Sequence, residues 1–315
     1  MATDQPTFDI AAALSRQSEA LRAATPTLME LRTQVAWPND LSLAQWLHLY
    51  AMTRDFAPDL VLELGRGYGN STAAFTQAVN DQRHGSVVSV SHDGERAWAT
   101  RTAPKVASSV GTRWFDRLEI REMDIFALDF DDLLAPTERV IVWWDAHGDE
   151  LARHLLTRMM APLKEKDHVI CVHDVDDARF DGVVAGYLRP DGLPTYWQGY
   201  LTSPFEELVP LYDFLSRNRI AYGTASASLA HLREKSNAEW RRLRETLDAV
   251  GGADAVHSGG WMWFSLRDRE AATLELPPVT PPLGDEPSRA EVPPIDPQAP
   301  RSIRYRMRRL VQLIR

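Results

Sequence analysis

Short apolar runs alternate with helix-length segments from residue 59 onward, and this alternation constrains the fold more than any other feature of the chain. The runs are rich in Val and Ile and several are apolar almost throughout, which is typical of strands buried on both faces of a parallel sheet. The helix-length segments between them predict βαβ units, and therefore a doubly wound, mostly parallel α/β sheet. Seven strands are expected, from LVLELG (60–65), SVVSVS (86–91), RLEIREMD (117–124), RVIVWWD (139–145), HVICVHD (168–174), RIAYGTASA (219–227) and WMWFSL (261–266).

The segments outside this sheet differ from it in composition. Two N-terminal stretches, FDIAAALSRQSEALRAA and LSLAQWLHLYAMTRDF, have the apolar spacing of helices, and the second ends before a proline. Prolines and acidic residues dominate near the C-terminus, and a short arginine-rich segment with helical periodicity follows them. The predicted organisation is a helical cap at 1–57, a sheet domain at 58–270 with insertions at 176–205 and 228–258, a linker at 271–300 and a basic amphipathic helix at 301–315.

The net charge and the number of cysteines disfavour some classes of protein. The chain of 315 residues has a formal net charge of −9, so its overall charge does not favour a nucleic-acid partner. Its single cysteine, Cys171, lies inside a predicted strand and is expected to be a core residue, and one cysteine allows no internal disulfide. No apolar run is long enough to span a bilayer and the N-terminus does not resemble a secretory signal, so a cytoplasmic protein is expected.

The basic segment 301–315 adds an expectation about partners. Its arginines surround one apolar helical face, which favours contact with the inner membrane surface or with a partner protein. The alternative is that it folds back on its own acidic domain, or on a second copy in a homo-oligomer.

A glycine-rich turn, Gly65-x-Gly67-x-Gly69, connects the first predicted strand to a helix. Glycines at such a turn allow a ligand to approach the backbone, and the helix that follows directs free N–H groups toward it. The dinucleotide pattern G-x-G-x-x-G needs a glycine at position 70, where the chain has Asn70, so a nicotinamide enzyme is disfavoured. A ligand-binding turn is favoured over a tight turn without a ligand.

With Glu63 two residues before the first glycine, the pattern becomes E-x-G-x-G-x-G, which resembles the first motif of class I S-adenosylmethionine-dependent methyltransferases. The resemblance implies a Rossmann-like methyltransferase fold with S-adenosylmethionine bound at this turn. In that family the acid helps to hold the ammonium group of the methyl donor. The implied donor contacts are Glu63, Gly65, Gly67, Gly69, Asn70 and Ser71.

The same resemblance implies two further donor contacts, after the second and third strands. An acid closing the second strand would bind the ribose hydroxyls, but Ser91 occupies that position, and Asp93 is expected to replace it. Asp124 follows the third strand and would face the adenine amino group; the alternative is a surface cap.

Two Asp/His pairs follow the fourth and fifth strands: Asp145 with His147, and His173 with Asp174. Ligands of open α/β sheets bind beyond the carboxyl ends of the strands, so these four side chains are expected at one edge. The run from DAH to VHD resembles a branch that contains cephalosporin-hydroxylase-like proteins and sugar O-methyltransferases. This implies O-methylation of a hydroxyl on a sugar, glycan or natural product, with the two insertions on the acceptor side.

Two mechanisms stay open for the residues at this edge. As in metal-dependent O-methyltransferases of the catechol type, Asp145, His173 and Asp174 would bind Mg²⁺, or Mn²⁺ because a histidine is present. Without a metal, His173 or His147, oriented by Asp145 or Asp174, would take the proton of the acceptor hydroxyl. An alternative of another class is a non-catalytic module that keeps the fold and recruits a partner through its basic tail.

Overall fold

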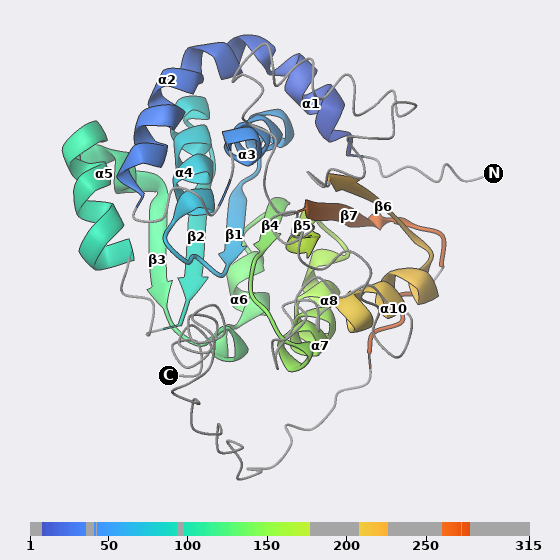
Figure 1. The fold of residues 1–315 in the computed structure, drawn as a ribbon. Helices are drawn as coiled ribbons and strands as arrows, with labels where there is room; N and C mark the ends of the chain where they lie inside the picture. Colours follow the sequence, from blue (N-terminus) through green and yellow to red (C-terminus); the bar gives the residue numbers. More distant parts are fainter. Residues whose placement is uncertain are drawn as a thin grey trace, which may run out of the picture.

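A seven-stranded mixed sheet forms the centre of the protein, with strand order β3-β2-β1-β4-β5-β7-β6 (Figure 1). The computed structural model describes residues 8–35, 41, 43–92, 98–176, 208–225, 260–271 and 273–277. The doubly wound α/β fold predicted from the sequence is confirmed. The strands are β1 (Leu60–Leu64), β2 (Ser86–Ser91), β3 (Leu118–Glu122), β4 (Arg139–Trp144), β5 (Asp167–Asp176), β6 (Ile220–Ala225) and β7 (Gly260–Arg269).

The chain direction of the strands brings several chain segments to one edge of the sheet. Strands β1 to β5 are parallel, whereas β7 runs antiparallel to both β5 and β6. β1 pairs with β2 on one side and with β4 on the other, so the strand order reverses at β1. In open α/β sheets this reversal is where the loops after neighbouring strands separate and leave room for a ligand.

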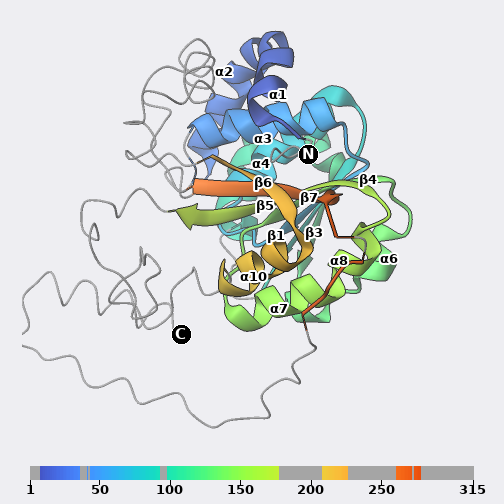
Figure 2. The ribbon, with the colours of Figure 1, turned by 90° about the vertical axis from the view of Figure 1, so that its right-hand side faces the viewer.

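Helices cover both faces of the sheet (Figures 1 and 2). One face carries α1 (Ile10–Arg16), α2 (Ser18–Gln34), α3 (Leu43–Phe56), α4 (Asn70–Gln82) and α5 (Ala103–Val110). The other carries α6 (Phe130–Leu134), α7 (Asp149–Arg158), α8 (Met160–Leu163) and α10 (Leu208–Asn218). Three short non-α helices complete the described elements: η1 (Trp98–Thr102), η2 (Thr112–Arg117) and η3 (Ile125–Ala127).

Helix α2 is longer than the sequence pattern predicts, because it continues through Pro26 to Gln34. A proline inside a helix removes one backbone hydrogen bond and disfavours the helix locally. Here Leu21, Leu28 and Leu31 lie on one buried face with helical spacing. Burying each leucine side chain contributes roughly 2 kcal/mol, so the buried face outweighs the local cost of Pro26.

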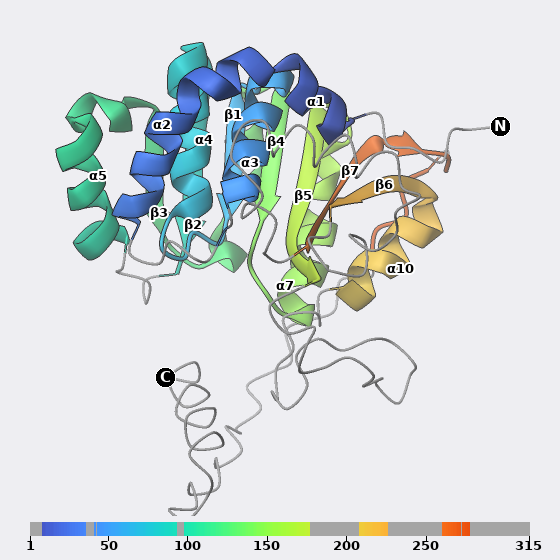
Figure 3. The same cartoon turned by 45° about the horizontal axis from the view of Figure 1, so that its top comes forward.

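The N-terminal helices share one hydrophobic core with the sheet. Leu21 and Leu28 of α2 and Trp46 of α3 belong to the same cluster as Val61 of β1 and Cys171 of β5. Figure 3 shows α3 lying beside α4 over this face of the sheet. The expectation that Cys171 is a core residue is confirmed, since its side chain is fully buried and its Sγ lies 3.5 Å from Met52 Sδ.

Several predicted segments fall outside the described residues. They are residues 177–205 and 228–258 of the two insertions, most of the linker, and the basic segment 301–315, so these stay predictions. Among the helices that the structure does describe, none has both the length and the apolar character needed to cross a membrane.

Candidate functional site

The glycine turn after β1 packs directly against the chain that leaves β4. The backbone φ values of Gly65, Gly67 and Gly69 are +94°, +51° and +91°, and residues other than glycine rarely adopt such values. A Cβ at Gly65 would lie 2.1 Å from the carbonyl oxygen of Asp145, and one at Gly69 would lie 2.1 Å from the Trp98 ring. Glycine is therefore required at both positions by neighbouring parts of the protein itself. The consequence is that the turn and Asp145 are in contact.

Glu63 fixes the helix that follows this turn. Its side chain is completely buried, and its two carboxylate oxygens accept hydrogen bonds from Ser71 Oγ (2.5 Å) and Thr72 Oγ1 (2.6 Å) in the first turn of α4. Burial raises the pKa of the Glu63 carboxyl, and the two hydroxyl groups oppose that rise. Glu63 and Ser71 thus hold the N-terminus of α4 in place, and a direct contact of either residue with a methyl donor stays a prediction.

Two further side chains at the turn are bound within the protein. Asn70 is buried, and its Oδ1 accepts a hydrogen bond from Trp46 Nε1 of α3 at 3.2 Å. Arg66, which the sequence analysis did not single out, is also buried, and its Nη1 donates to the carbonyl oxygen of Ser89 at 3.0 Å. A charged residue between two glycines of such a turn was the only local signal for Arg66.

The structure describes only some of the residues that were predicted to contact the ribose and the adenine. Ser91 is buried at the end of β2, and Asp93 lies outside the described residues. Asp124 is exposed and caps η3, where its Oδ1 accepts a hydrogen bond from the Phe126 N–H at 3.0 Å. Asp124 therefore has the capping role weighed as the alternative, and its contact with adenine stays a prediction.

Asp145, which follows β4, and His173 of β5 form a partly buried hydrogen-bonded pair. His173 Nδ1 lies 3.0 Å from Asp145 Oδ1, and the histidine is only 4 % exposed. The His173 ring packs against Trp143, with 5.2 Å between the ring centroids. These two residues were predicted to lie at one edge of the sheet, and the structure places them in contact.

A third residue of this group, Gln45, comes from α3. Its Nε2 lies 3.0 Å from His173 Nε2, and the side chain is 4 % exposed. Gln45 was not among the site residues predicted from the sequence. The only signal in the sequence was that Gln45 and His48 are polar residues with helical spacing in the mostly apolar stretch 43–52 of the helix.

His147 lies on the open side of Asp145. Its Nε2 is 3.9 Å from Asp145 Oδ1, and its side chain is 38 % exposed. The same carboxylate oxygen therefore faces a buried histidine, His173, and an accessible histidine, His147. Of the two, only His147 has a side chain that a soluble substrate can reach in this arrangement.

The arrangement of His173 does not fit a metal ligand. Its Nδ1 is engaged by Asp145 and its Nε2 by Gln45, whereas coordination needs a ring nitrogen with a lone pair directed at the ion. Within the described part of the chain, no three His, Cys, Asp or Glu side chains converge as a metal site would need. The side chain of Asp174, the third predicted ligand, is not among those described.

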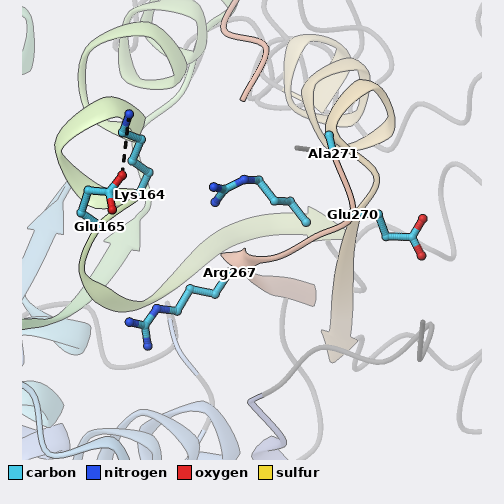
Figure 4. Close-up of a pocket in the computed structure, with 6 residues that line it drawn as sticks. Lys164, Glu165, Arg267, Glu270 and Ala271 are labelled. Atoms are coloured by element: carbon cyan, nitrogen blue, oxygen red, sulfur yellow. Dashed lines mark ion pairs between the residues drawn. The ribbon is translucent and has the colours of Figure 1, made fainter. Parts of the chain in front are cut away.

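A separate pocket of about 490 Å³ lies at the opposite end of β5 (Figure 4). Its walls are mostly charged, and one ion pair, between Lys164 and Glu165, spans 3.7 Å. β5 begins at Asp167, so His173 is six residues, or roughly 20 Å of strand, away from this end. The pocket therefore does not belong to the Asp145–His173 site. Its lining residues are Lys164, Glu165, Arg267, Arg269, Glu270 and Ala271.

The solved structures to which this chain is similar share less than a fifth of its sequence. No protein-family model matches the chain, and no curated protein matches its sequence. One similar solved structure is a cofactor-bound protein from MTB, with 17 % identity, a TM-score of 0.45, and coverage of 78 % of this chain and 90 % of that one. Another is the O-methyltransferase TomG from Streptomyces achromogenes, involved in tomaymycin synthesis and solved with SAM, with 18 % identity, a TM-score of 0.42, and coverage of 82 % and 91 %. The SAH-bound methyltransferase PaMTH1 of Podospora anserina has 16 % identity, a TM-score of 0.43, and coverage of 80 % and 87 %.

Proposed function

We propose that this chain is an S-adenosylmethionine-dependent O-methyltransferase that acts on a hydroxyl group of a sugar, glycan or natural product. The observation that carries the proposal is the contact between the glycine turn and Asp145, where a Cβ at Gly65 would lie 2.1 Å from the Asp145 carbonyl oxygen. Because of this contact, a ligand on the turn lies next to the Asp145, His147 and His173 group. The reversal of strand order at β1 supports the same location for a ligand.

The turn has the features that a methyl donor requires. S-adenosylmethionine, when bound, supplies a methyl group on a positively charged sulfur. Gly67 has a positive φ, and the N-terminus of α4, held by Glu63, directs backbone N–H groups toward the same space. We propose that the backbone of 65–69, with Asn70 and Ser71, holds the methionine portion, and that Asp93 and Asp124 contact the ribose and the adenine.

We propose His147 as the general base. The acceptor oxygen forms a bond to the methyl carbon while the bond from that carbon to sulfur breaks, and the hydroxyl proton moves to His147. Asp145 lies beside the imidazolium that results, at 3.9 Å, and stabilises its charge. His173 is the less suitable base, because it is buried and both its ring nitrogens already face other side chains.

The proposed reaction proceeds without a metal ion. Asp145 and His173 are bonded to one another, which favours proton transfer over metal coordination at this position. A requirement for Mg²⁺ or Mn²⁺ would instead need His173 to leave both Asp145 and Gln45. Loss of turnover after treatment with a chelator would contradict this part of the proposal.

Donor binding can be tested at Gly67. We expect Gly67→Ala to weaken binding of S-adenosylhomocysteine by about tenfold, or about 1.4 kcal/mol, because the added methyl group occupies donor space. Gly111→Ala is the matched control, since Gly111 also has a positive φ (+82°), but no heavy atom of the described residues other than its chain neighbours lies within 4 Å of its added Cβ. Isothermal titration calorimetry measures both. Equal affinities in the two folded variants would remove the turn from the donor site.

Catalysis can be tested at His147. We expect His147→Ala to lower kcat by about 100-fold, the usual contribution of a general base, while S-adenosylhomocysteine binding stays within twofold. The assay follows S-adenosylhomocysteine formation with a panel of sugars and phenols as acceptors. His84→Ala, which removes an exposed histidine that contacts Asp59, is the control. Donor binding without turnover on any acceptor would favour the non-catalytic module instead.

A further inference from the structure

Trp98 lies directly against the last glycine of the glycine turn. A Cβ added at Gly69 would lie 2.1 Å from Cε3 and 2.3 Å from Cζ3 of the Trp98 ring, so the indole fills the space that a side chain at position 69 would need. Trp98 is only 2 % exposed, and its ring meets that of Phe115 edge-on with 6.5 Å between the centroids. The tryptophan is therefore held in place on the side away from the turn as well.

A second residue of the same short helix holds the neighbouring residue of the turn. Thr102 Oγ1 donates a hydrogen bond to the carbonyl oxygen of Tyr68 at 2.9 Å, and Thr102 is fully buried. Trp98 and Thr102 are the first and last residues of η1, which is a π-helix. Short π-helical segments are rare and are frequently found at functional sites. One short helix thus contacts two consecutive residues of the turn, Tyr68 and Gly69.

The segment that carries Asp93 is attached to the glycine turn at both of its ends. On the side of β2, the Gly65 N–H donates to the carbonyl oxygen of Val90 at 2.9 Å. On the side of η1, Trp98 packs on Gly69. Asp93, the residue predicted to contact the ribose, lies between these two points in the chain. Trp98 therefore connects the proposed methionine site to the segment with the predicted ribose contact.

We propose that Trp98 and Thr102 are positioning residues for the methyl donor, which hold the glycine turn in its donor-binding conformation and anchor the segment that carries Asp93. The inference rests on the proposed function, in which the donor binds to the backbone of 65–69. Gly69 is the N-cap residue of α4 and, as a glycine, has no side chain that could bond to the first N–H groups of the helix. The direction of these N–H groups toward the donor therefore depends on the backbone of the turn.

Donor affinity supplies the first measurement. We expect Trp98→Leu to weaken binding of S-adenosylhomocysteine by about tenfold in isothermal titration calorimetry, because the free protein then adopts the donor-binding conformation of the turn less often. KM for S-adenosylmethionine should rise by a similar factor while kcat at saturating donor stays within twofold, since the acceptor side is unchanged. Trp98→Phe, which keeps an aromatic ring at this position, should recover most of the affinity. Unchanged affinity in folded Trp98→Leu, or a lower kcat with unchanged affinity, would overturn the proposal.

Trp114→Leu is the matched control for loss of a buried tryptophan. Trp114 is 7 % exposed and its ring also packs against Phe115, with 4.9 Å between the centroids, but its Nε1 donates to Gln77 in the middle of α4. Both variants lose buried contacts, so we expect the midpoint of thermal unfolding to fall in both. Donor affinity should fall only in Trp98→Leu. An equal loss of affinity in the two variants would mean that Trp98 acts through general stability, and would refute its positioning role.

A double-mutant cycle tests the contact itself. Gly69→Ala places a Cβ 2.1 Å from the Trp98 ring, so this change alone should weaken binding of S-adenosylhomocysteine. In the Trp98→Leu background the indole is gone, and we expect Gly69→Ala to weaken binding at least about fivefold less than it does in the wild type. Independent, multiplicative effects of the two changes would show that the contact does not bear on donor binding, and would contradict the proposal.

Thr102 gives a test that does not depend on how the tryptophan variants fold. Thr102→Val keeps the shape of the side chain but removes the hydroxyl group that bonds to the Tyr68 carbonyl. We expect it to weaken S-adenosylhomocysteine binding about threefold, and Thr102→Ser, which retains the hydroxyl group, to stay closer to the wild type. Equal affinities of the valine and serine variants would remove Thr102 from the proposal.

These outcomes separate the inference from the proposed function. Absence of S-adenosylhomocysteine binding in the wild type refutes the methyltransferase proposal, and the inference with it. A wild type that binds the donor and turns over, with an affinity that is insensitive to Trp98 and Thr102, refutes only the inference.

Discussion

Acidification from pH 7 to pH 4 is expected to lower the free energy of unfolding by about 6 kcal/mol, through two buried histidines that are neutral in the folded protein. His168 is one of them, at the start of β5. Its Nδ1 donates to the Lys166 carbonyl (3.0 Å) and its Nε2 accepts from the Leu266 N–H (2.9 Å). Burial lowers the pKa of His168 to about 4. A proton on Nε2 would meet the Leu266 N–H and break a link between β5 and β7.

His48 is the other histidine. It is buried in α3 against Trp261, and within the described part of the chain neither of its ring nitrogens has a hydrogen-bond partner. Burial lowers the pKa of His48 to about 4 as well. Charging this ring would place an unpaired cation in an aromatic environment.

The direction of the effect follows from proton binding. Both folded-state pKa values lie below the ordinary histidine value of about 6.5, so between pH 6.5 and 4 the unfolded chain binds more protons than the folded one. The contribution of these two neutral histidines to the free energy of unfolding is therefore fully present above about pH 6.5. It falls as the pH drops, by about 3 kcal/mol for each histidine at pH 4, with little further loss below that.

Urea unfolding at a series of pH values measures this loss. His48→Leu and His168→Gln should each remove about half of the difference in unfolding free energy between pH 7 and pH 4. His84→Gln, at an exposed position, should leave most of it. A pH dependence that survives in the double variant of His48 and His168 would assign the acid sensitivity to other groups.

Gly65→Ala is expected to destabilise the protein by about 3–5 kcal/mol, the second large effect. The positive φ of +94° disfavours a side chain, and the added Cβ would lie 2.1 Å from a backbone oxygen that no rotamer change can move. The chain after β4 must shift, and Asp145 shifts with it. Any folded Gly65→Ala protein should therefore also lose the proposed methyl transfer.

Gly111→Ala measures the cost of a positive φ without the cost of a steric clash. Gly111 has a φ of +82° with open space around the added Cβ, so its cost should be smaller by about 2 kcal/mol. Chemical denaturation of the two variants gives the difference. Equal destabilisation would mean that the contact between the glycine turn and Asp145 is not tight in solution.

Much of the fold could be predicted from residues close together in the chain. The runs of β1, β2 and β4, which are rich in Leu, Val and Ile, became buried central strands, because strands of this composition are stable between two helical layers. Asp145 and His173 were also placed correctly at one edge, since parallel neighbouring strands end on the same side. The end of α2 was missed, because Pro26 is a local signal and the buried leucine face that outweighs it becomes visible only in packing.

The chemistry of the site depended on contacts between distant parts of the chain. The glycine-rich turn after β1 explains a glycine at position 65, yet only the tertiary structure shows that the backbone of Asp145 approaches it. Gln45 Nε2 lies 3.0 Å from His173 Nε2, and no pattern of spacing connects residues 128 positions apart. The spacing of apolar residues shows which face of a helix or strand is buried, and this spacing is a property of short stretches of the chain. Which two side chains meet on that face is decided by the fit of whole helices against the sheet.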